Sequence, residues 1–190
     1  MAISNFISAG IMLHEQGKMD VSLSLICSVL DATAKKVIPS KNNNQRNKEF
    51  IRKYMPIITT YGFPGLYAGA IMIKCIDIPN LKTDKDGFVG IEDIIYHTIR
   101  CGLIHECEIE SLIEFTDETE TGDFIGKFKI PKQLFWGLAM ATILCKENKN
   151  LKLDSDMQIS ISGFDFTVNE LFGKQDELDK LVKEKADTNV

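Results

Sequence analysis

A long amphipathic segment, residues 20–37, places the strongest constraint on the fold of this chain. Its apolar residues recur every three or four positions, which is the spacing of one face of an α-helix. These residues are Leu23, Ile26, Leu30, Ala34 and Val37. We expect Asp20 to cap the helix, because a carboxylate at that point accepts the free amide hydrogens of the first turn. A helix with such a stripe buries it against other elements, so the pattern favours a helical bundle.

Similar patterns and helix-ending residues place further helices along the chain. They are predicted at residues 2–16, 45–59, 91–107, 131–146 and 169–186. Gly17 is expected to end the first of them, and Pro131 suits the first turn of the fourth in this list. Residues 66–75 allow two interpretations, since the nearby glycines permit a turn and the apolar side chains also fit a buried helix.

Two segments alternate between apolar and polar residues, which is typical of β-hairpins. Residues 111–116 and 123–130 flank a polar stretch that ends in Gly122, and a second hairpin is predicted around Gly163. The predicted fold class is therefore mostly α, an antiparallel helical bundle with one or two small peripheral β-hairpins.

The length of 190 residues fits a single domain with a sizeable core. We expect residues 1–147 to form the helical bundle, including a β-hairpin near residues 111–130. Residues 148–190 are expected to add a hairpin and a helix packed on the same domain. No apolar run approaches the roughly 20 residues that span a bilayer, and the N-terminus lacks the basic start of a secretory signal. The expected location is the cytoplasm, with no membrane contact.

The cysteines and the net charge limit the kinds of binding site that this chain is expected to have. Five cysteines without a C-x-x-C pair suggest neither a disulfide framework nor a zinc site, and we expect no metal and no cofactor. The net charge of −5 argues against broad nucleic-acid binding. Residues 35–53 nevertheless hold seven basic residues and one acid. Candidate RNA-binding residues there are Lys41, Arg46, Lys48, Arg52 and Lys53; the alternative is a solvated loop and helix face.

The predicted helix 91–107 carries the groups best suited to chemistry. Arg100 offers a permanent positive fork for a phosphate, and His105 can hold or release a proton near neutral pH. On a regular α-helix these side chains, five positions apart, point about 140° away from each other. The alternative for Arg100 is a salt bridge, for example to Glu92 or Glu106. The alternative for His105 is a cation at the C-terminus of its helix.

The run IRCGLIHE around Arg100 and His105 resembles the motif of HEPN domains, and SLSLICSVLDATAKK resembles the helix that packs beside that motif. The resemblance covers residues 1–147. It implies a homodimer whose motif helices meet at a shared cleft. It also implies metal-independent endoribonuclease action that leaves a 2′,3′-cyclic phosphate, with Arg100 and His105 as the catalytic pair.

Two further positions bear on this resemblance. Asp31, a carboxylate in an otherwise apolar helix, is a candidate to orient Arg100 or His105, as an acidic residue does in some relatives; the alternative is an exposed residue beside the stripe. Cys101 follows Arg100 where the family usually has a polar residue. Members without the full motif often serve as interaction modules. The second hypothesis is therefore a non-catalytic helical module, with a protein partner, in a defence or stress system.

Other patterns favour structural roles. His97, Cys101 and His105 share a spacing that suits metal ligands, but a packing stripe is the preferred interpretation. The loop KTDKDGFVGIED resembles a calcium loop, yet Lys82 stands where the first carboxylate belongs, so a turn is preferred. Likewise, Trp136 is assigned to the core rather than to base stacking, and His14 to a helix surface.

Overall fold

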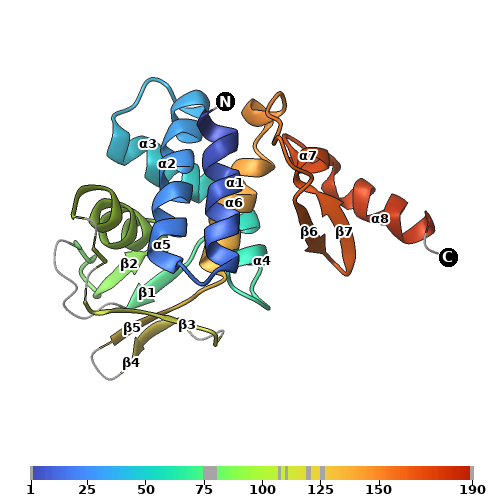
Figure 1. Cartoon of the computed structure of the whole chain (residues 1–190). Coiled ribbons are helices and arrows are strands. Elements are labelled where there is room, and N and C mark those ends of the chain that lie inside the picture. Colours follow the sequence, from blue (N-terminus) through green and yellow to red (C-terminus); the bar gives the residue numbers. More distant parts are fainter. Residues whose placement is uncertain are drawn as a thin grey trace.

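The protein is mostly α-helical, with small sheets at its periphery, as the sequence predicts (Figure 1). The computed structural model describes residues 2–74, 81–106, 108–109, 111–118, 121–124 and 127–188. The α-helices are α1 (Ala2–Glu15), α2 (Met19–Val37), α3 (Asn43–Lys53), α4 (Met55–Gly62), α5 (Ile91–Ile94), α6 (Leu134–Ile143), α7 (Val168–Leu171) and α8 (Leu178–Thr188). Two π-helical segments, η1 (Ile95–Arg100) and η2 (Gly102–Glu106), follow α5, and two 3₁₀ turns are η3 (Lys146–Asn148) and η4 (Gln175–Glu177).

Within the described ranges, the strands form three small sheets. They are β1 (Met72–Lys74), β2 (Phe88–Gly90), β3 (Ile113–Thr116), β4 (Gly122–Phe124), β5 (Lys127–Pro131), β6 (Gln158–Ile161) and β7 (Phe164–Thr167). β1 pairs with β2, and β6 pairs with β7, both antiparallel. The three-stranded sheet has the order β3-β5-β4, with β3 parallel to β5. In Figure 1 this sheet lies below the bundle. The β6–β7 pair and α8 lie beside the bundle.

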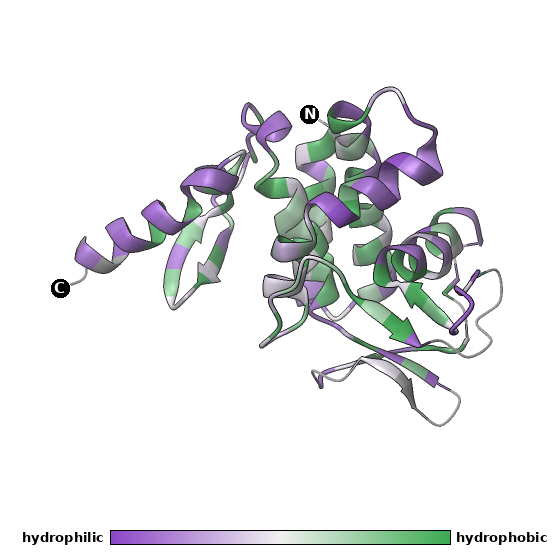
Figure 2. Cartoon of the chain, turned by 180° about the vertical axis from the view of Figure 1, so that it is seen from behind, coloured by the Kyte–Doolittle hydropathy of each residue, from purple (hydrophilic) through white to green (hydrophobic). Residues whose placement is uncertain are grey.

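Helix α6 lies at the centre of the bundle. All of its residues except Trp136 are buried, and it packs against both α4 and α2. A helix that is apolar on every side belongs in the interior of a protein. The apolar stripe of α2 predicted from the sequence is buried in the same core; its members Leu23, Ile26 and Ala34 have no exposed surface. In contrast, α8 is largely hydrophilic along its length (Figure 2).

Residues after 147 share this core. Phe166 and Leu171 belong to the same apolar cluster as Leu138. The side chain of Asn148, which is 1% exposed, donates to Thr33 Oγ1 at 3.0 Å and accepts from Lys36 Nζ at 2.8 Å. These bonds fasten the start of the C-terminal segment to α2.

Several predicted boundaries were wrong. Helix α2 begins at Met19, so Asp20 lies in its first turn and does not cap it. The predicted helix 45–59 divides at Tyr54 into α3 and α4, because Pro56 fits the first turn of a helix but not its interior. Pro131 ends β5 instead of opening a helix, and α6 starts at Leu134.

The predicted hairpin pairing was also wrong in part. Residues 111–116 do not pair with 123–130 as an antiparallel hairpin; β3 runs parallel to β5, and the antiparallel partner of β5 is β4. The second predicted hairpin is confirmed, with Ser162 and Gly163 at positive φ in its turn. Residues 66–74 contain no buried helix, since Tyr67 is 79% exposed and the segment ends in β1.

The predicted C-terminal helix is interrupted at Gly173. This residue has φ +74°, and a Cβ placed there would lie 2.4 Å from the Cβ of Lys149. Its backbone N–H donates to Ile143 O at 2.9 Å. With this positive φ, Gly173 cannot continue a helix. The helix α7 therefore ends before Gly173, and α8 begins after η4.

Helices α4 and α6 approach each other through two glycines. A Cβ on Gly62 would lie 3.2 Å from the Cα of Gly137, and a Cβ on Gly137 would lie 2.5 Å from Ile58 O. Both contacts involve backbone atoms, which cannot move aside without shifting a helix.

Gly137→Ala is therefore expected to lower the free energy of unfolding by about 2 kcal/mol, the usual cost of forcing an extra methyl group into a packed core. Urea unfolding measures this loss, and the dependence of the unfolding free energy on urea concentration should have the same slope as in the wild type. Gly69→Ala is the control, because a Cβ at Gly69 meets no atom within 4 Å. Equal stability of Gly137→Ala and the control would contradict the close approach of these helices.

Candidate functional site

Arg100 and His105 lie together because their helix is not an α-helix. Backbone hydrogen bonds here span five residues, as in the bond from Cys101 N–H to Tyr96 O. In a π-helical turn the residue five positions ahead is the neighbour on the same face. The predicted 140° separation is therefore wrong. Arg100 Nη1 lies 2.9 Å from His105 Nε2. The predicted last residue of this helix, Cys107, lies outside the described residues.

Asp31 on α2 holds the other edge of the guanidinium. Arg100 Nε donates to both carboxylate oxygens, at 3.3 and 3.1 Å, and Nη2 also donates to Oδ2. The Arg100 side chain is only 8% exposed, whereas that of Asp31 is 21% exposed. A cation so deeply buried requires a paired charge. The partner is thus Asp31, and not Glu92 or Glu106; Glu92 pairs with Arg52.

The electrostatics of this cluster follow from burial and from the ion pair. Burial alone would lower the pKa of Arg100, but the hydrogen bonds and the charge of Asp31 outweigh it and raise that pKa. Burial, helped by the negative charge of Asp31, raises the pKa of Cys27 to about 12, so this thiol stays protonated. Burial also raises the pKa of Tyr96. The guanidinium of Arg100 is therefore the permanent positive charge of the site.

The hydrogen bond between Arg100 and His105 fixes the state of the imidazole. Arginine has only donors, so His105 Nε2 must accept and must carry the lone pair. In the neutral ring the proton then resides on Nδ1. His105 is exposed, unlike Arg100. The site therefore places a fixed N–H donor beside a basic nitrogen near the protein surface.

Two neighbours of this pair escaped the sequence analysis. The Tyr96 ring lies 5.4 Å from Arg100 Cζ, and Cys27 lies one turn from Asp31 on α2. The spacing in the sequence could have indicated both neighbours. Tyr96 lies four positions before Arg100, and Cys27 lies four positions before Asp31, which is the spacing of side chains on one helix face. Cys101 also contacts the guanidinium, with Arg100 Nη1 3.7 Å from its sulfur.

The metal-like patterns have structural explanations. His97 lies 3.9 Å from Asp93, and burial together with Lys48 lowers its pKa. The Asp84 carboxylate accepts from the backbone N–H groups of Asp86 and Phe88, as in a turn. Within the described ranges, no group of three His, Cys, Asp or Glu side chains is placed to hold a metal ion.

Much of the basic segment is paired with acids. Lys41 pairs with Glu49, Lys48 with Asp93 at 2.8 Å, and Arg52 with Glu92 at 2.7 Å. These last two bonds fasten α3 to α5, and thereby to the helix that carries Arg100.

The other two candidates in this segment form no salt bridge in the described residues. Arg46 donates to Lys41 O and to the side chain of Asn43. Lys53 lies over the Tyr54 ring, and its charge helps to lower the pKa of Glu147. In Figure 2 the ribbon of α3 is coloured mostly as hydrophilic. The five predicted RNA-binding residues therefore include three whose charge is compensated.

Comparison with known proteins supports a family assignment. A protein-family model described as Rv1289 matches residues 2–190. The chain belongs to the Rv1289 family. Similar proteins are Mb1320 of Mycobacterium bovis and MT1327 and Rv1289 of Mycobacterium tuberculosis, each described as uncharacterised. Each is 22% identical over 193 residues, which cover 96% of this chain and 88% of the relative.

These names state no activity, so the resemblance to HEPN domains stays a prediction for this Rv1289 family member. No solved structure matches the chain. In the described residues, no helix combines the length and the apolar character needed to cross a membrane.

The Arg100–Asp31 pair gives a measurable coupling. Asp31→Asn is expected to destabilise the protein by about 3 kcal/mol, since it leaves a buried cation without a counter-charge. In an Arg100→Met background the same change is expected to cost less than about 1 kcal/mol, because no buried charge remains to be compensated. Urea unfolding of the four proteins measures the difference. Equal costs in the two backgrounds would show that Asp31 does not stabilise Arg100.

Proposed function

We propose that this protein is a HEPN-like endoribonuclease that works without a metal ion through Arg100 and His105. The observation that supports this proposal is the 2.9 Å contact between Arg100 Nη1 and His105 Nε2, with Asp31 on the opposite edge of the guanidinium. A phosphate-binding donor and a proton acceptor thus stand side by side, which is what cleavage through the 2′-hydroxyl requires.

The two groups divide the work as follows. Asp31 occupies Nε and Nη2 of Arg100, so Nη1 is the part of the fork that faces the exposed His105. A phosphate oxygen that binds Nη1 would take the place of Nε2. The freed lone pair on Nε2 would then accept the proton of the 2′-hydroxyl as its oxygen attacks phosphorus. The 5′-oxygen of the next nucleotide leaves and takes up a proton from water to become a 5′-hydroxyl, and a 2′,3′-cyclic phosphate remains. His105 then releases its proton to water. Arg100 stabilises the charge on the phosphorane oxygens.

Asp31 is a positioning residue in this mechanism. It holds the guanidinium in one orientation, so the donor is in place before the substrate binds, and this lowers the ordering cost of the reaction. The proposed enzyme acts in the cytoplasm as a homodimer, with the Arg100–His105 pairs of the two copies facing one cleft. Among the basic residues of α3 and its flanks, Arg46 is best suited to contact RNA phosphates, because its hydrogen-bond partners are neutral, whereas Lys53 also interacts with Glu147.

The second candidate function is a non-catalytic interaction module. Two observations favour it: the Arg100 side chain is 92% buried in its pair with Asp31, and Cys101 stands where the motif usually has a polar residue. In this alternative the cluster acts as a structural tie between α2 and the π-helical segment, and it contacts no substrate.

Cleavage of RNA in the presence of EDTA distinguishes the two functions. The wild-type protein is expected to release fragments with 2′,3′-cyclic phosphate ends, and His105→Ala to be at least about 100-fold slower, the usual contribution of a proton-transfer group. His97→Ala is the matched control, because His97 lies in η1, close before the segment η2 that carries His105, but faces Asp93 and Lys48. His97→Ala should retain the wild-type rate.

Each other outcome has a clear meaning. Equal cleavage by the wild type and His105→Ala would reject the proposed catalytic role. A wild-type protein that cleaves no RNA, whether structured or single-stranded, would favour the interaction module.

A further inference from the structure

A groove of about 290 Å³, here named the β6 groove, lies between the helical bundle and strand β6. Its lining residues are Glu15 of α1, Tyr61 of α4, Trp136 and Met140 of α6, and residues 158–160 of β6. Three consecutive residues of β6 thus take part. Because successive side chains of a strand point to opposite faces, this set indicates that the edge of β6 borders the groove. In Figure 1, β6 is the strand of its hairpin that lies on the side of the bundle.

The ladder between β6 and β7 determines which backbone groups this edge presents. Val168 N–H donates to Met157 O at 2.8 Å, which continues the register of the two strands. In an antiparallel pair every second residue bonds the partner strand, so Ile159 also bonds β7. The N–H and C=O groups of Gln158 and Ser160 therefore point away from β7. Within the described residues, these groups have no hydrogen-bond partner.

The opposite edge of the same sheet is covered by side chains. Lys185 Nζ donates to Asp165 O at 2.9 Å, and Thr167 N–H donates to Glu170 Oε2 at 2.6 Å. Both of these backbone groups point away from β6, as the alternation of the ladder requires. Proteins usually protect a strand edge, because its unpaired backbone groups pair readily with another chain. Here β7 is protected, whereas the edge of β6 beside the groove is open to pairing.

The walls of the β6 groove suit a short length of extended chain. Trp136, the residue of α6 that is not buried, lines it together with Met140 and Tyr61. Aromatic rings and a thioether accommodate apolar side chains of different shapes. One end is bounded where Ser8 Oγ donates to Met157 Sδ at 3.4 Å, which joins the start of β6 to α1. The space is too small for a folded element of a second protein, but it can hold a few residues of a single strand.

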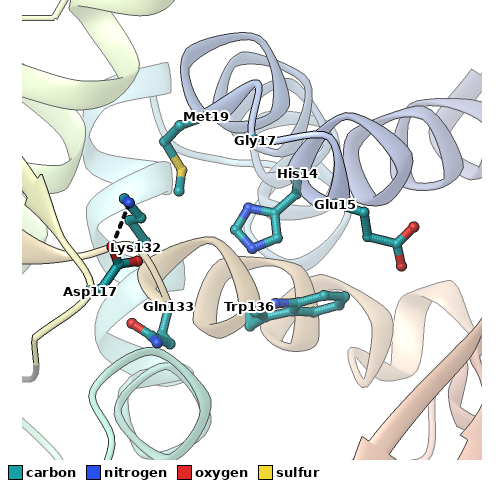
Figure 3. A pocket seen from close by; sticks show the side chains of 8 residues that line it. All are labelled: His14, Glu15, Gly17, Met19, Asp117, Lys132, Gln133 and Trp136. Atoms are coloured by element: carbon teal, nitrogen blue, oxygen red, sulfur yellow. Dashed lines mark hydrogen bonds and ion pairs between the residues drawn. The ribbon is translucent and has the colours of Figure 1, made fainter.

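The charge of the lining favours a basic partner. Glu15 is the charged residue of the described lining, and no salt bridge in the described part of the chain engages it. Figure 3 shows a neighbouring pocket, in which Glu15 and Trp136 lie on the side away from Lys132. Lys132 pairs instead with Asp117 at 2.8 Å. The negative charge at the groove therefore favours a positively charged segment, since complementary charges steer partners together and select among them.

We propose that the β6 groove binds an extended, positively charged segment of another protein, which adds to the edge of β6 as a further strand. The backbone of the segment bonds the N–H and C=O groups of Gln158 and Ser160. Its apolar side chains contact the wall formed by Trp136 and Met140, and a basic side chain reaches Glu15. In this mode of recognition the backbone bonds supply affinity, and the side-chain contacts supply specificity. This binding does not depend on RNA cleavage at the π-helical segment.

The probe for this proposal is a heptapeptide of alternating lysine and valine, acetylated and amidated at its ends. Trp136 is the single tryptophan of the chain and lines the groove, so its fluorescence reports binding. Two further peptides carry N-methyl groups, one on every lysine and the other on every valine. Only every second residue of an added strand donates to β6. One methylated peptide is therefore expected to bind at least about tenfold more weakly than the other, the effect of one hydrogen bond at the upper end of its usual range.

Two outcomes of this titration would overturn the proposal. One is the absence of saturable binding of the unmodified peptide to the wild-type protein. The other is equal binding of the two methylated peptides, whether tight or weak, because an added strand cannot treat the two sets of N–H groups alike.

A variant of the protein tests the same contact from the other side. Ser160→Pro removes an N–H from the open edge without removing a bond to β7, and proline is tolerated at strand edges. It is expected to weaken binding of the unmodified peptide by about tenfold. Asp165→Pro is the matched control, because Asp165 is the register partner of Ser160 and its N–H points away from β6. The control should bind as the wild type does. A folded Ser160→Pro that binds equally well would contradict strand addition, and the methylated peptides decide the matter without any change to the protein.

A peptide with glutamate in place of lysine tests the charge argument. It should bind the wild-type protein at least about threefold more weakly, which is the effect of one exposed charge pair. Glu15→Gln should narrow the difference between the two peptides. Equal binding of the glutamate and lysine peptides to the wild type would overturn the assignment of a basic partner.

Discussion

The arrangement of the central part of the molecule depends on one buried cation and its counter-charge. Arg100 brings a guanidinium into an environment where it is 8% exposed, and Asp31 compensates it through three hydrogen bonds. An isolated charge at this depth would cost several kcal/mol. The pair therefore links α2 to the π-helical segment, and it sets the direction in which the remaining N–H groups of Arg100 point.

The π-helical backbone gives this ion pair its functional interest. In a regular α-helix, the neighbours of Arg100 would be the residues three and four positions ahead, Leu103 and Ile104. With hydrogen bonds that span five residues, the neighbour is His105 instead. π-helical turns are uncommon and occur frequently at functional sites. The five-residue spacing brings Arg100 and His105 together only because the backbone is π-helical. The sequence pattern does not reveal that backbone geometry.

The sequence predicts the parts of the fold that arise from local periodicity and turn chemistry. The apolar stripe of α2 and the Gly163 hairpin are of this kind, because each depends on residues close together in the chain. The parallel pairing of β3 with β5 depends on contacts between distant residues, and no local pattern encodes it. The break at Gly173 depends likewise on the approach of Lys149. For the site, the residue types of Arg100, His105 and Asp31 were sufficient to select them. The contact of Asp31 with Arg100 was one of two predicted alternatives. The contact of Arg100 with His105 was not predictable, since a helical pattern does not distinguish α from π backbone.

The polar cluster of the described structure that is best suited to chemistry is the one on the π-helical segment, where a fixed donor faces a basic nitrogen. The central claim is that Arg100 donates a hydrogen bond to Nε2 of His105. Nitrogen-15 NMR of histidine-labelled protein, at a pH where the ring is neutral, tests it directly. The account predicts that the His105 proton resides on Nδ1 in the wild type and that this preference is lost in Arg100→Met. A proton on Nε2 in the wild-type protein would contradict it.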